Sequence, residues 1–272
     1  MNVISGDKRR SSRRATGLLL VTSAIGVLVM AGVSPAVASE SEQRCGDATL
    51  VAVRGSYDGK AGSGTGATPY VYAHGTGGEG AMMAELIRAF EVERNIPVYV
   101  EALNYPAVIW PDVVNSGYVE SERVGVNALR GEVNALAADC PSTVIQLAGY
   151  SQGAHVIGDV LSDRTQLSER ARQLLDGVAL FGDPAYKAGE PWDDSSNGSG
   201  DGRFARGKGE LNGWDRTSTK SATPITMIHS WCVPDDIFCQ SGTSQDAHQS
   251  YGNVSTQLDA FEFLRSFLTT AD

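Results

Sequence analysis

The sequence predicts an α/β fold in which helices cover both faces of a mostly parallel central sheet. Short runs rich in β-branched residues alternate along the chain with longer stretches that carry apolar residues at helical spacing. Strands that alternate with helices in this way form a parallel sheet covered on both sides. No internal repeat interrupts the order, and the length suits one large domain with a substantial core.

The predicted elements follow one another in chain order. Strands are expected at residues 50–53, 70–73, 97–103, 144–148, 178–181 and 225–229. Helices are expected at residues 81–94, 120–138, 152–161, 168–175 and 258–268.

Two long stretches break this alternation. Residues 55–68 are rich in Gly, Ser and Thr, and residues 187–222 hold seven glycines among charged and hydroxyl residues. A loop as long as the second is uncommon in a compact domain unless it is functional or disordered, so we expect a floppy, solvated excursion there. Its run 193–202 is weakly similar to a calcium loop, but the ligand spacing does not fit an EF-hand and no calcium site is expected.

The N-terminus has the layout of a secretory signal. A basic cluster, Lys8 to Arg14, precedes the uncharged residues 15–39, whose apolar centre is shorter than the roughly 20 residues of a membrane span. The small residues that end at Ala38 predict cleavage near that position, which leaves residues 39–272 as a single secreted domain. An uncleaved anchor is the alternative. Arg13-Arg14 leaves the twin-arginine export route open beside the general one.

The mature chain is strongly acidic. Removing residues 1–38 leaves 17 Lys and Arg against 31 Asp and Glu, a formal charge of −14. Such a surface repels phosphate backbones and anionic lipid, which argues against nucleic-acid binding and electrostatic membrane docking. A neutral or cationic substrate suits it better.

Four cysteines, Cys45, Cys140, Cys232 and Cys239, lie after the predicted cleavage point. In an oxidising compartment they predict two disulfides. Three connectivities exist for four cysteines, and the short separation of Cys232 from Cys239 favours a local bridge that leaves Cys45 with Cys140. The spacing fits no zinc site, so no metal is expected.

The strongest chemical signal is the sequence Gly149-Tyr150-Ser151-Gln152-Gly153 between a predicted strand and a predicted helix. A nucleophilic serine needs such a strained strand-turn-helix bend, which lifts its hydroxyl clear of the sheet, with glycines where the chain approaches itself closely. The N–H group of Gln152, at the helix start, would point at a developing oxyanion. The residues therefore predict Ser151 as a nucleophile.

A serine nucleophile needs a histidine base, and in this order of elements the acid and the base follow the serine. His248 lies in a loop that can reach across the sheet edge, whereas His229 lies in a predicted strand and reads as a packed residue. His74 precedes the serine, and the ring of His155 would point away from it. His248 is therefore the expected base.

Three aspartates could orient that histidine: Asp183, Asp235 and Asp236. An Asp-Pro turn at a strand end is sufficient to explain Asp183. The other two lie between Cys232 and Cys239, where a disulfide would supply the rigidity that an orienting carboxylate needs. The residues alone do not choose between these neighbours.

Two segments of the first half match a known family in register. Cys45 leads through a strand to Val53-Arg54-Gly55-Ser56, and Cys140 leads to the G-Y-S-Q-G turn at residues 149–153. They resemble the cutinase family, whose members carry A-R-G-[ST] and the same G-Y-S-Q-G sequence; here Val53 replaces the alanine. The resemblance implies a three-layer α/β-hydrolase sandwich and serine esterase activity at an active site without a lid.

Two segments of the second half extend the resemblance. Cys232 to Cys239 is similar to the family's C-x-x-x-D-x-x-C, and Ala247-His248 with Tyr251 is similar to its P-H-x-x-Y. The aspartate of the first pattern falls on Asp236, so the resemblance selects Asp236 over Asp235. It extends from Cys45 to about Phe267, with interruptions at residues 57–78 and 187–222.

The resemblance also implies a role for each site residue. Ser151 would be the nucleophile, His248 the general base and then acid, and Asp236 the carboxylate that orients the imidazole. The oxyanion hole would be Ser56 and Gln152. The segment His74–Gly78 is similar to the H-G-x-G oxyanion segment of other esterases and remains an alternative to Ser56.

Taken together, these features predict a secreted serine esterase that forms an acyl-enzyme, needs no cofactor and acts as a monomer on a polyester, a lipid or an acylated polysaccharide. Among enzymes, the alternatives are an acetylxylan esterase and a cell-envelope lipid or mycolate esterase. The alternative of another class is a non-catalytic secreted binding protein on a hydrolase scaffold. The natural ester stays open, because the resemblance is interrupted where the substrate would be contacted.

Overall fold

Five parallel strands form the central sheet of the computed structural model, which describes residues 44–58, 78, 80–109, 117–217 and 224–268. They are β1 (Ala48–Val53), β2 (Val98–Ala102), β3 (Val144–Tyr150), β4 (Leu175–Phe181) and β7 (Ile228–Trp231), and they lie in the order β2-β1-β3-β4-β7. Every neighbouring pair is parallel. All described residues belong to the unit Ala38–Asp272, and the predicted signal segment lies outside them.

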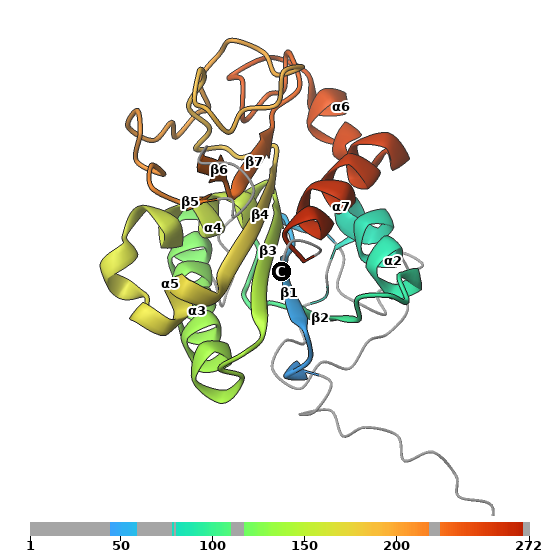
Figure 1. The fold of residues 1–272 in the computed structure, drawn as a ribbon. Helices are drawn as coiled ribbons and strands as arrows, with labels where there is room; N and C mark the ends of the chain where they lie inside the picture. Colours follow the sequence, from blue (N-terminus) through green and yellow to red (C-terminus); the bar gives the residue numbers. More distant parts are fainter. Residues whose placement is uncertain (1–43, 59–77, 79, 110–116, 218–223, 269–272) are drawn as a thin grey trace, which may run out of the picture. The chain divides into compact units, whose positions relative to one another are not determined.

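Helices cover both faces of this sheet (Figure 1). One face carries α3 (Tyr118–Asp139), α4 (Gln152–Ser162) and α5 (Glu169–Leu174), and the other carries α2 (Ala84–Val92) and α7 (Val254–Leu268). Short helical turns, η1 (Ala81–Met83), η2 (Arg164–Gln166), α6 (Gln245–His248) and η3 (Ser250–Gly252), complete the connections. The predicted three-layer α/β sandwich is confirmed.

The core divides into two layers because side chains alternate along each strand. In β1, Val51 and Val53 pack into the cluster under α3 and α4, whereas Leu50 and Ala52 pack into the cluster under α2 and α7. All six residues of β1 are buried, as expected for a strand that is covered on both faces.

The strand order has a topological switch point between β1 and β3. After β1 the chain forms β2 on one side and then crosses to form β3 on the other, so β1 and β3 lie at a topological switch point. Ligands of open parallel sheets bind outside the carboxyl ends of the strands at such a point. Ser151 follows β3 directly, and residues 54–57 follow β1.

The predicted limits of one strand were wrong, and another predicted strand lies outside the described residues. The expected strand 225–229 is two short strands: β6 (Pro224–Thr226) pairs antiparallel with β5 (Asp215–Thr217), and β7 pairs with β4. The change of partner falls at Met227, whose N–H donates to the carbonyl of Trp214 and whose carbonyl accepts from Val178. The strand expected at residues 70–73 lies outside the described residues.

The loop expected to be a floppy, solvated excursion is instead packed into the molecule over its described part, residues 187–217. Trp192, Leu211 and Trp214 are buried in the same apolar cluster as α3 and α4, and the indole N–H of Trp214 donates to the carbonyl of Leu161 at 3.0 Å. At six of its seven glycines, a Cβ would come within 3 Å of another group. A Cβ at Gly198, for example, would lie 2.3 Å from Oε1 of Gln240. We call residues 187–217 the insertion.

Among the described residues, no helix combines the length and the apolar character that a bilayer crossing requires.

Candidate active site

Ser151 occupies a strained turn between β3 and α4. Its φ of 54° lies in the left-handed region, and its backbone N–H donates to the carbonyl of Phe181 in β4 at 2.8 Å. The turn needs glycine on its far side, because a Cβ at Gly153 would lie 1.9 Å from the carbonyl oxygen of Val53. The turn therefore brings the helix start against β1 and holds the serine at the carboxyl edge of the sheet.

His248 lies within hydrogen-bond distance of that serine. Its Nε2 atom is 2.9 Å from Ser151 Oγ, and its Nδ1 atom is 2.9 Å from Oδ2 of Asp236. The serine is 8% exposed, the histidine 3% and the aspartate fully buried, so the chain of contacts runs from the surface into the interior. The structure thus brings together three residues that are up to 97 positions apart in the sequence.

Asp236 is held as an ionised acceptor. Besides the imidazole, its carboxylate accepts hydrogen bonds from the backbone N–H groups of Phe238 and Cys239 and from the hydroxyl of Tyr251. Burial raises the pKa of this carboxyl, but the hydrogen bonds and the charge of His248 outweigh it, so the net pKa lies below the ordinary value. A carboxylate with four donors has a fixed orientation and can in turn orient the histidine.

Two disulfides are present, and they are the pairing that the sequence favoured. Cys45 is bonded to Cys140, and Cys232 to Cys239. The second bridge closes the loop that carries Asp236, and both of its cysteines are fully buried. The acid therefore lies in a loop that is closed covalently.

The insertion supports the same loop from outside, which sequence reasoning missed. Asn197 accepts a hydrogen bond from the N–H of Cys232 at 2.7 Å, and its amide donates to the carbonyl of Ser230. The side chain of Gln240 accepts from Gly200 N–H, and Arg203 donates to the carbonyl of Ile237. A glycine-rich composition gives no signal for such contacts, because the partners lie about 40 positions away.

Two tyrosines hold the histidine loop. The hydroxyl of Tyr150 donates to the carbonyl of His248 at 2.8 Å, and the hydroxyl of Tyr251 accepts from Val233 while it donates to Asp236. Their places in the G-Y-S-Q-G and H-x-x-Y segments were the signal available in the sequence. The ring of Phe238 stands edge-on to the imidazole, with 4.6 Å between the ring centroids.

The rival acids have other partners. Asp183 accepts from the N–H of Ala185, as an Asp-Pro turn requires, and forms an ion pair with the buried guanidinium of Arg206. Asp235 accepts from the backbone and hydroxyl of Thr243 at the surface.

The rival histidines are likewise engaged elsewhere. His229 pairs with Asp194 of the insertion at 3.1 Å and stacks on Trp231. It is therefore partnered, although by a carboxylate that the sequence did not indicate. His155 pairs with the hydroxyl of Tyr118. His74 lies outside the described residues.

Two groups beside Ser151 are suited to binding negative charge. The N–H of Gln152 is at the first residue of α4, where no carbonyl of the same helix can accept it. The Gln152 side chain is fully buried and donates to the carbonyls of Val108 and Tyr118, which fixes the turn. Among the residues that the structure describes, the buried Ser56 hydroxyl has no hydrogen-bond partner.

Ser56 lies near Ser151 because the preceding residue, Gly55, packs against that serine. A Cβ at Gly55 would lie 3.2 Å from Cβ of Ser151, so the chain at residues 55–56 runs against the serine. An unpaired buried hydroxyl at this place is one that a substrate oxygen could satisfy. Residues 74–77 of the alternative oxyanion segment lie outside the described residues.

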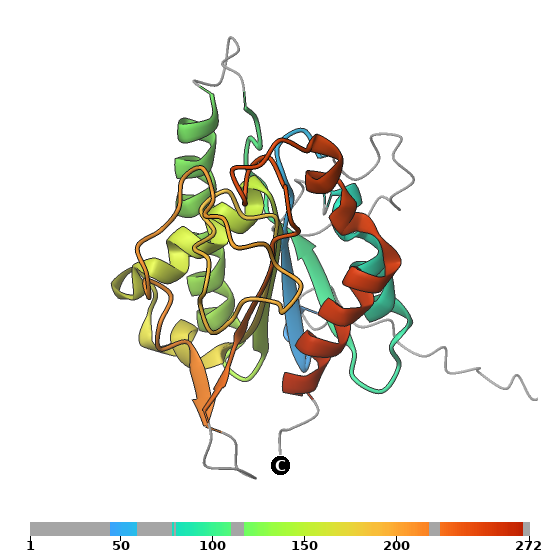
Figure 2. The ribbon, with the colours of Figure 1, turned by 90° about the horizontal axis from the view of Figure 1, so that it is seen from above.

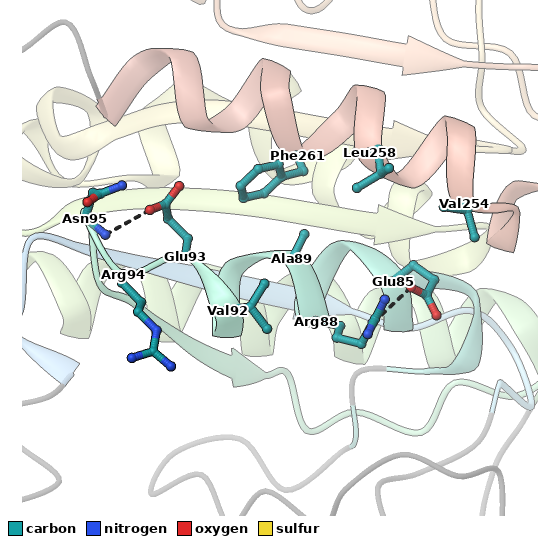
Figure 3. Close-up of a pocket in the computed structure, with 10 residues that line it drawn as sticks. All are labelled: Glu85, Arg88, Ala89, Val92, Glu93, Arg94, Asn95, Val254, Leu258 and Phe261. Carbon is teal, nitrogen blue, oxygen red and sulfur yellow. Dashed lines mark hydrogen bonds and ion pairs between the residues drawn. The ribbon is translucent and has the colours of Figure 1, made fainter.

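A cavity of about 460 Å³ lies elsewhere, between α2 and α7 (Figure 3). Phe261 and Leu258 of α7 face Ala89 and Val92 of α2 across it, and the ion pair of Arg88 with Glu85 lies at its side. It shares no residue with the Ser151 site. Among the described residues, no group of three or more His, Cys, Asp or Glu side chains is arranged to hold a metal ion.

A comparison of the sequence with protein-family models matches the Cutinase family over residues 63–268. The chain belongs to the cutinase family of carboxylic ester hydrolases. Acetylxylan esterase 2 of Talaromyces purpureogenus is 28% identical over 166 residues, which cover 56% of this chain and 66% of that protein. Cutinase 11 of Verticillium dahliae is 29% identical over 62% of this chain and 58% of its own length. Both matches cover less than two thirds of the relative.

A longer match is to carboxylesterase Culp1 of Mycobacterium tuberculosis, 28% identical over 242 residues and 89% of each chain. Among solved structures, an acetylxylan esterase determined at 0.90 Å resolution superposes with a TM-score of 0.64, at 22% identity, over 82% of this chain and 99% of its own. A cutinase-like protein from Cryptococcus sp. gives a TM-score of 0.58 at 18% identity, over 83% and 97% of the two chains. These structures share the fold of the cutinase family with this chain.

Proposed function

We propose that this member of the cutinase family is a secreted serine esterase in which Ser151, His248 and Asp236 form the catalytic triad. The observation that carries the proposal is the pair of 2.9 Å contacts of His248, one to Ser151 Oγ and one to Asp236. A histidine between a serine hydroxyl and a buried carboxylate is the arrangement that activates a serine for attack on a carbonyl carbon.

The reaction has two steps. Oγ of Ser151 attacks the ester carbonyl while Nε2 of His248 takes the hydroxyl proton, and the same nitrogen then gives that proton to the leaving alcohol. Water enters, His248 removes its proton, and the hydroxide oxygen attacks the acyl-enzyme; return of the proton to Oγ releases the carboxylic acid. Asp236 stays ionised throughout and keeps Nδ1 protonated, so that Nε2 is free to accept.

The oxyanion of each tetrahedral intermediate is held by the N–H of Gln152 and by Ser56 in this proposal. The buried, unpartnered hydroxyl of Ser56 supports that role, since the polar atom costs free energy until a substrate oxygen pairs with it. Fixed donors stabilise the charge as it develops, without reorganisation.

Residues 1–38 act as a secretory signal, and residues 39–272 as the catalytic domain, in this proposal. The basic N-terminal cluster, the apolar centre and the small residues up to Ala38 support cleavage there, and two disulfides suit an oxidising compartment. The mass of the protein recovered from culture medium tests this: a mature chain that begins near Ser39 is expected, and retention of Met1 would contradict it.

Substitution of the nucleophile tests the activity. Ser151→Ala should abolish hydrolysis of p-nitrophenyl butyrate and covalent labelling by a fluorophosphonate, while the circular dichroism spectrum stays unchanged. Ser162→Ala is the matched control, because this serine lies on the same helix and its hydroxyl bonds only within it, to the carbonyl of Gly158 at 2.9 Å. Turnover that survives Ser151→Ala would refute the mechanism, and absence of labelling in the wild type would favour a binding protein.

The substrate class is a separate matter, because the relatives carry names as different as acetylxylan esterase, cutinase and carboxylesterase. A profile of kcat/KM against acyl-chain length, together with acetylated xylan, triglycerides and polyester film, would separate a polysaccharide esterase from a lipid or mycolate esterase. We expect a polysaccharide esterase to prefer acetyl groups and a lipid or mycolate esterase to prefer long acyl chains.

A further inference from the structure

Three aromatic rings pack against one another beside the N-terminal ends of α3 and α4. Phe204 of the insertion stacks on Tyr118, the first residue of α3, with ring centroids 5.4 Å apart and planes 15° apart. It also stacks on His155 of α4 at 5.7 Å and 22°. Phe204 is 50% exposed although it packs against two rings, so part of its ring surface faces solvent. We call Tyr118, His155 and Phe204 the aromatic platform.

The platform is held firmly, which separates it from an incidental surface aromatic. The N–H of Phe204 donates to the carbonyl of Pro184 at 2.9 Å. Two residues later, the buried guanidinium of Arg206 donates to the carbonyl of His155 at 2.8 Å and pairs with Asp159 and Asp183. Fixed rings lose little conformational entropy when a ligand stacks on them.

Arg206 also brings the insertion directly against α4. A Cβ at Gly158 would lie 2.1 Å from the guanidinium, so only glycine allows this approach. Figure 2, which looks down from above, shows the insertion passing beside α4. Phe204 therefore belongs to a segment that is fixed against the helix that begins after Ser151.

The platform residues are connected to the turn that carries Ser151. His155 follows Ser151 by about one helical turn, a rise of about 5.4–6 Å. Tyr118 is bonded to the next residue of the turn, since its carbonyl accepts from the Gln152 side chain at 3.3 Å. Pro184 follows β4, whose last residue accepts the Ser151 N–H. All three rings are thus anchored to the segments that hold the nucleophile.

The surroundings of the rings are acidic and rich in hydrogen-bond acceptors. Asp159 lies one helical turn after His155 and is partly exposed, and Glu122 of α3 is hydrogen-bonded to Asp159. Burial and the neighbouring Asp159 raise the pKa of Glu122 to about 7, so this carboxyl can also donate near neutral pH. An aromatic face bordered by carboxyl groups suits a neutral ring that carries hydroxyls, because its C–H face can stack while its hydroxyls bond to the rim. It does not suit an anion, and a flexible acyl chain would leave the rim without partners.

We infer that the aromatic platform is a substrate subsite that binds a pyranose ring of the ester, and that Phe204 sets a preference for acylated polysaccharide. This inference rests on the proposed esterase function and names the substrate class of the same site.

The test compares two acetyl esters that present the same acyl group to Ser151. For the wild type and for Phe204→Ala, kcat/KM is measured on acetylated xylo-oligosaccharides and on vinyl acetate, with the concentration of active sites fixed by fluorophosphonate titration. We expect the ratio of the two values to fall roughly tenfold in Phe204→Ala, the scale of one lost ring contact. Phe204→Trp should retain the ratio, and Phe204→Leu, which keeps apolar bulk without a ring, should lose it.

Leu258→Ala is the matched control, because Leu258 is a similarly exposed apolar residue on α7, at the opposite face of the sheet, and should leave the ratio unchanged. A ratio that stays within twofold in Phe204→Ala overturns the inference, as does a loss that appears on long-chain acyl esters instead. Either outcome leaves the esterase proposal standing, since that proposal depends on Ser151→Ala and on labelling.

Discussion

The side-chain carbonyl of Asn197 accepts a 2.7 Å hydrogen bond from the backbone N–H of Cys232, which begins the loop that carries Asp236. With the amide of Asn197 bonded to Ser230, one side chain joins the insertion to both β7 and the acid loop. The insertion therefore contacts the proposed active site at two places: Asn197 holds the loop of Asp236, and Phe204 packs on His155, one helical turn after Ser151.

Loss of the Asn197 hydrogen bonds should lower the rate of catalysis more than it weakens substrate binding. Asn197→Ala leaves the N–H of Cys232 without its partner, and we expect kcat to fall about tenfold to about hundredfold while KM changes little, since small displacements of catalytic groups are costly. The free energy of unfolding should fall by about 1–3 kcal/mol. Asn197→Asp, which keeps the acceptor oxygen, should recover most of kcat. Steady-state kinetics and urea denaturation provide these values, and an unchanged kcat in Asn197→Ala would remove the insertion from the mechanism.

Removal of the Cys45–Cys140 disulfide should cost more stability, whereas removal of the Cys232–Cys239 disulfide should cost more activity. The Cys45–Cys140 bridge spans 95 positions and the Cys232–Cys239 bridge spans 7, so chain entropy predicts losses of about 4–5 and about 2–3 kcal/mol on removal. Only the short bridge holds the loop of Asp236. Replacing both of its cysteines by serine should therefore reduce kcat strongly, while the same change at the long bridge should spare kcat of the folded protein. Equal kcat values for the two double variants would show that the short bridge has no positioning role.

Ser56→Ala should separate activity from stability. If its hydroxyl donates to the oxyanion, removal should lower kcat about 10²-fold with little change in KM. Stability should not fall, because the buried hydroxyl has no hydrogen bond to lose within the described part of the chain. Steady-state kinetics and thermal denaturation of the same sample test both halves. Full activity would transfer the role to the His74–Gly78 segment.

The sequence predicted the parts of the fold and site that depend on local pattern. Period-two and helical spacing located the strands and helices, and the glycines around Ser151 identified the turn, because no other residue fits there. Asp235 and Asp236 could not be distinguished from the residues alone, since both lie in the loop between Cys232 and Cys239. Their side chains point in different directions: Asp235 is bonded to Thr243 at the surface, whereas Asp236 points inward to His248.

The rest depends on contacts between distant parts of the chain. A glycine-rich stretch has the same composition whether it is solvated or closely packed. Gly198, for example, is closely packed because of Gln240, which lies 42 positions later in the sequence. The break of the expected strand at Met227 likewise depends on two distant residues to which Met227 is hydrogen-bonded: Trp214, which precedes β5, and Val178 of β4.

Two glycines of neighbouring helices should respond oppositely to alanine. At Gly153 a methyl group would collide with the Val53 carbonyl at 1.9 Å, and we expect a loss of about 3 kcal/mol in the free energy of unfolding together with loss of activity. At Gly131, an exposed position of α3, nothing lies within 4 Å, and alanine should stabilise the protein by about 1 kcal/mol. Chemical denaturation of the wild type and of the two alanine variants measures both changes in the free energy of unfolding. Equal effects at the two positions would contradict the close approach of α4 to β1.

A buried carboxyl should make stability depend on pH in an unusual direction. Glu101 of β2 is 1% exposed and shares Arg44 with Glu132. Burial, reinforced by Glu132, raises the pKa of Glu101 from 4.5 to about 8 in the folded chain. Between these values the folded state holds a proton that the unfolded state has released, so the free energy of unfolding should decrease as pH rises, by at most about 1.4 kcal/mol per pH unit.

Glu101→Gln removes the proton-binding group but keeps an acceptor for Arg44, so its stability should change less between pH 5 and pH 8 than that of the wild type. The measurement is the free energy of unfolding in urea at half-unit steps of pH. Glu91→Gln serves as the control, because this exposed glutamate is solvated in both states and its replacement should leave the wild-type slope intact. Parallel curves for the wild type and Glu101→Gln would mean that Glu101 is ionised in the folded protein, with Arg44 stabilising it.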